Sequence, residues 1–177
     1  MTASYDYLPP ASALQLRSTT VRDGHPLPVA QMSAMKGVPG GRDRSPQLSW
    51  TGHPPATMSF VVSMYDPQAY TGSGFWHWVL ADIPATTTDL PEGAGAVGSP
   101  QLPTGAFQLD CDAGMPQFFG AAPPPGSGVH EYRITVTALD VDSCGVDATA
   151  SAALLGFTIA PHTLARAVIV CPTPAPA

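Results

Sequence analysis

The chain has 177 residues, of which 44% are hydrophobic and only 11% are charged. Its seven Lys and Arg residues are scattered singly against a formal net charge of −6, which argues against nucleic acid or an acidic membrane surface as a partner. No apolar run approaches the ~20 residues of a membrane span, and the first residues lack the basic and apolar regions of a signal peptide. We therefore expect a cytoplasmic protein without stable membrane insertion.

Short segments rich in Val, Ile and aromatic residues alternate with clusters of Gly and Pro, a pattern typical of an all-β fold. We expect residues 1–13 to form a flexible arm, residues 14–171 a single domain and residues 172–177 a tail. The predicted strands are, in chain order, Leu14–Val21, Gln47–Thr51, Met58–Asp66, Phe75–Ile83, short strands near Gly105–Leu109, His130–Asp140 and Ala167–Cys171. Two helices are predicted in Ala- and Leu-rich segments, Asp147–Gly156 and Ala160–Ala167. Strands followed by late helices favour an antiparallel sandwich with the helices at one end.

Three cysteines, Cys111, Cys144 and Cys171, are odd in number and lack the spacing of metal ligands. We expect reduced thiols of a cytoplasmic protein, and a disulfide between Cys144 and Cys171 is the alternative. The carboxylates on either side of Cys111 disfavour its thiolate and therefore its reactivity.

Three predicted strands each place one ionisable residue, Asp66, His77 or His130, on an otherwise apolar face. Side chains alternate along a strand, so the residues that share a face can be counted off. Asp66 goes with Met58, Phe60, Val62 and Met64; His77 with Phe75, Val79, Ala81 and Ile83; His130 with Tyr132, Ile134, Val136 and Ala138. If these strand ends meet at one rim of the sandwich, they form the polar floor of an apolar pocket.

Each of these residues also has a simpler structural interpretation. Asp66 precedes Pro67 and could cap a turn. His77 lies between two tryptophans and could be a packed, hydrogen-bonded core residue, and His130 could lie at the surface end of its strand. The sequence alternation by itself does not decide between these interpretations and a site.

The long stretch of residues 84–128 has few firm elements, which is typical of a functional loop. It leads into a Gly- and Pro-rich loop, Gly120 to His130, whose glycines allow a ligand to approach the backbone closely. Such a loop can turn N–H groups toward an anion, although it lacks the Gly-Lys-Ser/Thr ending of a nucleotide-binding loop. The alternative is a rigid polyproline-like surface turn.

Four ordered motifs carry a family resemblance. They are Ser45-Pro-Gln-Leu-Ser-Trp50, Tyr65-Asp-Pro-Gln-Ala69, Gly74-Phe-Trp-His-Trp78 with Ile83-Pro84, and Gly120-x-x-Pro-Pro-x-Gly-x-Gly-x-His130-x-Tyr132. Together they resemble the phosphatidylethanolamine-binding, or Raf-kinase-inhibitor-like, family, and the bacterial branch of it in particular. The similarity spans about Leu14 to Val170.

This resemblance implies a Greek-key β-sandwich of two antiparallel sheets with short C-terminal helices, and in bacterial members often a homodimer. It also implies a pocket for phosphate, phosphoester head groups, acetate or similar anions. The residues that it assigns to the pocket or its rim are Asp66, Pro67, Gln68, Tyr70, His77, Gly120, Ala121, Pro123, Pro124, His130 and Tyr132. Neither a metal ion nor a cofactor is implied.

Three of these positions depart from the family pattern, which usually shows Asp-Pro-Asp-Ala-Pro and a Gly-Pro pair. Gln68 removes a carboxylate from the pocket rim, and Tyr70 puts a large ring where a proline is usual. Ala121 replaces the proline of the Gly-Pro pair. The first two changes put the usual ligand in doubt.

Two functions remain open at this point. In the first, the protein binds a small anion or a phospholipid head group, with His77 and His130 donating hydrogen bonds and Asp66 fixing a tautomer. In the second, the same three residues perform acid–base chemistry, such as cyclisation, elimination or isomerisation, on a small metabolite. A Ser–His–Asp hydrolase is disfavoured because the Gly-x-Ser-x-Gly motif is missing.

Overall fold

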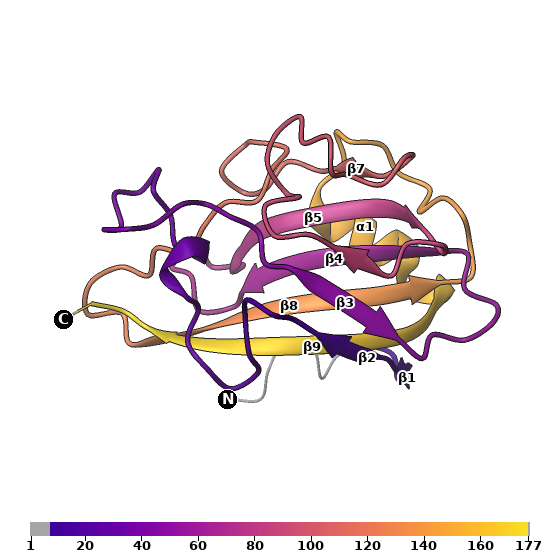
Figure 1. Ribbon diagram of the computed structural model, residues 1–177, viewed down its shortest axis with the longest axis horizontal. Coiled ribbons are helices and arrows are strands. Elements are labelled where there is room, and N and C mark those ends of the chain that lie inside the picture. The colour runs from indigo at the N-terminus through magenta and orange to yellow at the C-terminus, as the bar shows by residue number, and fades with distance from the viewer. Residues whose placement is uncertain (1–7, 177) are drawn as a thin grey trace.

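A computed structural model describes residues 8–176, which form two β-sheets and a short helix (Figure 1). The large sheet has the strand order β1-β9-β8-β4-β5-β7, and the small sheet has the order β2-β3-β6. The strands are β1 (Ser12–Ala13), β2 (Gln15–Arg17), β3 (Leu48–Thr51), β4 (Ser59–Asp66), β5 (Phe75–Pro84), β6 (Asp89–Leu90), β7 (Phe107–Gln108), β8 (Val129–Leu139) and β9 (Thr163–Pro174). The helix α1 is Ala152–Ile159, and 3₁₀ turns lie at Val29–Gln31 and Ala160–His162.

Both faces of the large sheet are covered. One hydrophobic cluster lies between the two sheets and includes Trp50 of β3, Phe60 of β4 and Trp78 of β5. A second cluster lies on the opposite face, where Leu155 of α1 packs among Val61 and its neighbours (Figure 1). Because β4 is the central strand between β5 and β8, its first four residues are all buried.

The predicted all-β sandwich of two sheets is confirmed. Its pairs are antiparallel except that β1 runs parallel to β9. The first predicted strand is shorter than expected, because the Ser18 hydroxyl accepts hydrogen bonds from the backbone N–H groups of Thr20 and Val21 and turns the chain. Part of the predicted arm, Ser12–Ala13, is paired, and residues 1–7 lie outside the described part of the chain.

The prediction of a helix at Ala160–Ala167 is wrong. The predicted tail, residues 172–177, is also wrong for residues 172–174, which belong to β9. The chain makes a single 3₁₀ turn at Pro161 and then enters β9, which pairs with β8 along its whole length. The β-branched run of residues 168–170 and this pairing outweigh the helix propensity of the alanines. Pro172 and Pro174 are tolerated because the far side of this part of β9 has no strand beside it among residues 8–176.

The other helix begins later than predicted. The Asp147 side chain accepts hydrogen bonds from the N–H and hydroxyl groups of Thr149 and so forms a local turn. The Ser151 hydroxyl then accepts from the N–H of Leu154, which is the usual cap of a helix that starts at the next residue. The four residues predicted before this cap, 147–150, therefore form a turn instead, which the Ala150 N–H closes on the Asp147 carbonyl.

The three thiols are free and buried, so the alternative of a Cys144–Cys171 disulfide is wrong. Burial, the main cause, raises the pKa of Cys144 to about 11 and that of Cys171 to about 12. Burial also raises the pKa of Cys111, with a smaller contribution from the adjacent carboxylates. All three residues are therefore neutral packing groups at physiological pH.

Candidate functional site

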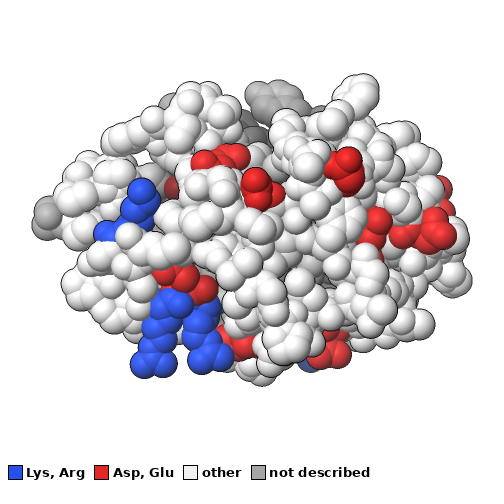
Figure 2. Space-filling view, turned by 90° about the horizontal axis from the view of Figure 1, so that it is seen from above, with Lys and Arg blue, Asp and Glu red and all other residues white. Residues whose placement is uncertain are grey.

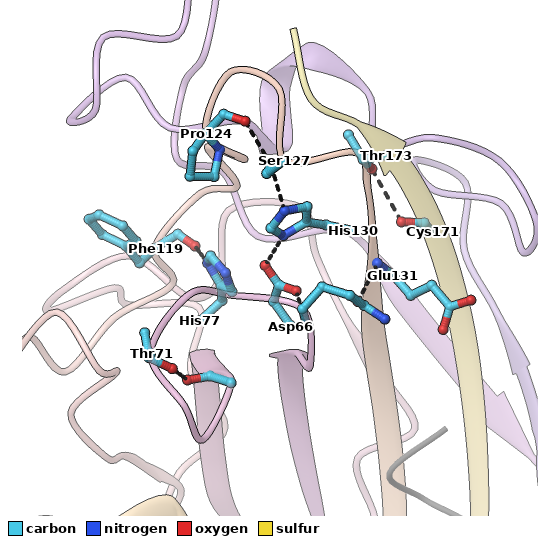
Figure 3. A network of polar contacts seen from close by, with 12 residues as sticks. Asp66, Thr71, His77, Phe119, Pro124, Ser127, His130, Glu131, Cys171 and Thr173 are labelled. Atoms are coloured by element: carbon cyan, nitrogen blue, oxygen red, sulfur yellow. Dashed lines mark hydrogen bonds and ion pairs between the residues drawn. The ribbon is translucent and has the colours of Figure 1, made fainter. Parts of the chain in front are cut away.

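Asp66, His77 and His130 come from three neighbouring strands and line one cavity of about 790 Å³. Asp66 ends β4, and the strands on either side of it carry the two histidines near their first residues. All three side chains are at most 5% exposed. Figure 3 shows Asp66 between the two imidazole rings, with the loop that carries Pro124 above them.

The predicted face is right for Asp66 and His130, but His77 reaches the cavity by a different route. Met64 of β4 pairs with Trp78 and Tyr65 pairs with Trp76, so His77 is an extra residue in β5. Such a bulge changes the direction of a side chain without breaking the sheet. Val79 and Ala81, which were predicted to share a face with His77, pack on the side of the large sheet that faces α1. Without the bulge, the His77 side chain would point to that side too.

A chain of hydrogen bonds runs through His130. Its Nδ1 lies 2.7 Å from Asp66 Oδ2, and its Nε2 lies 2.8 Å from Ser127 Oγ (Figure 3). The Ser127 hydroxyl donates its one proton to the Pro124 carbonyl at 2.6 Å, so Oγ is left to accept from Nε2–H. With Nδ1 paired to the Asp66 carboxyl group, both ring nitrogens of His130 are engaged by protein groups.

The second oxygen of Asp66 is fixed by its own loop. Asp66 Oδ1 accepts from the Gln68 N–H at 2.9 Å, and the Gln68 side-chain oxygen accepts from the Glu131 N–H at 2.9 Å. Gln68 therefore ties the end of β4 to the start of β8, on either side of the ion pair. Gln68, which stands where the family usually has a carboxylate, therefore makes a structural link and does not line the cavity.

His77 is held in one tautomer by a backbone partner. Its Nδ1 lies 2.8 Å from the Phe119 carbonyl oxygen, which can only accept, so the proton is on Nδ1. Burial lowers the pKa of His77, while the Phe119 carbonyl and the charges of Asp66 and Asp112 oppose this shift. The neutral ring therefore presents an unprotonated Nε2, which makes no hydrogen bond to any other described residue.

Most N–H groups of the Gly120–His130 loop are already used, contrary to the prediction that they face an anion. Gly120 N–H donates to Asp43 at 2.8 Å, and Ala121 N–H donates to the Gln31 carbonyl at 3.1 Å. A Cβ atom at Gly120 would lie 2.6 Å from the backbone of Met32, so only glycine fits at this crossing. These two residues lock the loop onto the preceding segment and do not line the cavity.

The cavity lining contains some of the predicted residues and several others. The predicted residues that line it are Asp66, Tyr70, His77, Pro123, Pro124, His130 and Tyr132; those that do not are Pro67, Gln68, Gly120 and Ala121. Sequence analysis missed the lining residues Lys36, Thr71, Phe75, Asp112 and Phe119, and also Ser127, which bonds His130. Phe75 lies within a family motif and could have been inferred from it. Ser127 falls on an unspecified position of the Gly120–His130 motif, and the sequence offers no signal for Lys36.

Lys36 is the basic residue in this lining. Its Nζ lies 5.9 Å from the ring centre of Phe119, whose ring in turn stacks on His77 at 6.2 Å. Figure 2 shows a largely uncharged face on which Lys and Arg gather toward one end, the end where the loop of residues 32–44 lies in Figure 1. Two carboxylates, Asp66 and Asp112, also line the cavity, so it is not strongly cationic.

The family model described as phosphatidylethanolamine-binding protein matches residues 17–173. The chain belongs to the phosphatidylethanolamine-binding protein family. The Escherichia coli (strain K12) proteins YbcL and YbhB are 42% and 44% identical to it, over 90% and 88% of this chain and 86% and 97% of their own lengths. The crystal structure of E. coli YbcL, described as a member of the mammalian PEBP family, matches with a TM-score of 0.87 at 40% identity and covers 92% of this chain and 98% of that one.

As a member of this family, the chain has bacterial relatives with the same β-sandwich. None of the helices within residues 8–176 is long and apolar enough to cross a membrane. In the same range, no three His, Cys, Asp or Glu side chains are grouped to hold a metal ion. The cytoplasmic location and the homodimer stay predictions.

Proposed function

We propose that this protein binds a small organic molecule that has a phosphoester or carboxylate group at one end and an apolar body. The observation that carries the proposal is that Asp66, His77, His130 and Lys36 line one cavity whose walls are otherwise mainly apolar. The family to which the chain belongs suggests phospholipid head groups or small anions as ligands.

The size of the cavity supports an apolar body on the ligand. About 790 Å³ is far more than a free phosphate fills and lies within the range of drug-sized ligand sites. Phe75, Phe119 and three consecutive prolines, Pro123 to Pro125, supply flat apolar walls. Tyr70 is 76% exposed at the rim, with its ring 6.4 Å from that of His130, and is placed to contact the body of a bound molecule.

The acidic end of the ligand would lie between His77 and Lys36. Lys36 supplies the positive charge, since both ring nitrogens of His130 are already bonded to Asp66 and Ser127. Tyr132 supplies a neutral hydroxyl, because burial and the nearby Asp66 charge raise its pKa far above the ordinary value. A singly charged acid is therefore a better match for the site than a highly charged one.

Phenyl phosphate, followed by calorimetry and by NMR shift changes, tests this proposal. We expect saturable binding that Lys36→Ala weakens by about five-fold, the effect of one partly exposed ion pair. Arg17→Ala removes the same charge from β2, outside the cavity, and is expected to leave the affinity unchanged. Benzyl alcohol, which has the body without the charge, should respond to neither variant. Equal effects of the two variants, or no saturable binding, would reject the proposal.

Acid–base catalysis is a second candidate, favoured by the unprotonated Nε2 of His77 beside a fixed Asp66–His130 pair. Molecules that co-purify with the protein, identified by mass spectrometry, can be returned to it in D₂O. Deuterium incorporation by the wild type but not by His77→Asn would support catalysis. Recovery of the molecules unchanged would support binding alone.

A further inference from the structure

We propose that His77 Nε2 is the hydrogen-bond acceptor of the cavity, so that the site takes its ligand in a protonated form, such as the monoanion of a phosphomonoester, whose P–OH donates to Nε2. The inference rests on the proposed function and specifies which ionisation state of the ligand is bound. It reverses the expectation that His77 donates a hydrogen bond to an anion.

The tautomer of His77 is set by its backbone partner. A carbonyl oxygen has no proton to give, so the 2.8 Å contact with Phe119 places the ring proton on Nδ1. The Phe119 N–H in turn donates to the His77 carbonyl at 2.9 Å, so the two residues are joined by two hydrogen bonds. The ring is further held by Phe75 at 4.7 Å and by Tyr132 at 5.3 Å, and its Nε2 remains available to a molecule in the cavity.

Burial outweighs the two nearby carboxylates, which would favour a second proton on His77, and the same carboxylates disfavour a doubly charged ligand. Asp66 and His130, from β4 and β8, oppose one another as an ion pair. Asp112 faces the ring from the loop before Met115, where its carboxylate accepts the Trp76 N–H at 2.8 Å. A dianion would meet both carboxylates, with Lys36 as the compensating cation.

The protonation states of His77 and of a phosphomonoester change over different ranges of pH. Burial lowers the pKa of His77, so its Nε2 is unprotonated above about pH 6.5. A phosphomonoester loses its second proton near pH ~6. Between about pH 6.5 and about pH 8 the protein group is therefore constant while the ligand loses the proton that the site needs.

Methyl phosphate and dimethyl phosphate are the matched probes, because the diester carries one negative charge at every pH but has no P–OH. We expect the affinity for methyl phosphate to fall by about ten-fold for each pH unit above ~6. The affinity for dimethyl phosphate should be weaker at pH ~6 and constant with pH. A flat profile for both probes would overturn the inference while leaving the proposed function in place, whereas failure of phenyl phosphate to bind at any pH would overturn the two together.

The variant His77→Asn separates the imidazole from the carboxylates. The asparagine amide lies near the position of Nδ1 and keeps a donor for the Phe119 carbonyl, but nothing replaces Nε2. In this variant we expect methyl phosphate to bind no better than dimethyl phosphate and without the pH slope. A slope that persists would assign the effect to repulsion by Asp66 and Asp112 and overturn the inference.

A measurement on the free protein gives an independent test. The ¹⁵N shifts of the His77 ring, recorded at about pH 7, distinguish the Nδ1–H tautomer from the Nε2–H tautomer and from imidazolium. The carbonyl partner of His77 requires Nδ1–H for its neutral ring. An Nε2–H signal for His77 would overturn the inference whatever the binding data show.

Discussion

Replacing Asp66 by alanine removes the acceptor of two hydrogen bonds from the floor of the cavity. One bond comes from the His130 ring at 2.7 Å and the other from the Gln68 N–H at 2.9 Å. The side chains of His130 and Asp66 are only 1% and 4% exposed, so the pair is shielded from bulk water. Breaking a buried ion pair from one side costs about 3–5 kcal/mol, and we expect Asp66→Ala to lower the free energy of unfolding by this amount.

The chain contains a matched control in a second Asp–His pair. His162 Nδ1 lies 2.9 Å from Asp140 Oδ1, but these side chains are 43% and 44% exposed. Asp140→Ala removes the same carboxylate and the same net charge, and is expected to cost about 0–1 kcal/mol because water screens an exposed pair.

Urea unfolding followed by tryptophan fluorescence at neutral pH measures both variants. The comparison is of unfolding midpoints at an unchanged slope, so that a change in compactness is not mistaken for one in stability. Costs for Asp66→Ala and Asp140→Ala that agree to within about 1 kcal/mol would refute the assignment of a buried, charged Asp66–His130 pair.

Further predictions concern packing, pH and thiol chemistry. Gly120→Ala places a Cβ 2.6 Å from the Met32 backbone and is expected to lower the free energy of unfolding in urea by about 2–4 kcal/mol. Gly156→Ala, in α1 with open space around it, is expected to raise that free energy by about 0.5–1 kcal/mol. Equal effects of the two variants would contradict this packing. Because burial lowers the pKa of His77, the unfolded chain binds a proton more readily than the folded one, and the free energy of unfolding is expected to fall as the pH drops below about 6.5. The difference in free energy of unfolding between wild type and His77→Asn should shrink over this range. The buried thiols, with the pKa of Cys171 raised to about 12, should not react with Ellman's reagent at about pH 8 until urea unfolds the protein; rapid reaction of the native protein would show that the thiols are accessible.

Several features of the fold and site could be predicted because they depend on short-range patterns. Alternation along β4 and β8 is local, so it placed Asp66 and His130 on the inner face before any pairing was known. The four motifs likewise identified the family, since each is a continuous run of residues. The helix at Ala160–Ala167 failed for the opposite reason, because the partner that makes this segment a strand, β8, lies more than 20 residues earlier.

The sequence alone therefore determined the all-β class, the family and the inner face on which Asp66 and His130 lie. Tertiary structure decided how the site works. It brings His77 to the cavity through a bulge against β4, fixes its tautomer through Phe119, and directs the N–H groups of Gly120 and Ala121 away from any ligand. Each of these results depends on a hydrogen bond between residues far apart in the chain. Which atom of a polar residue remains free for a ligand is settled only when its other atoms have found their partners.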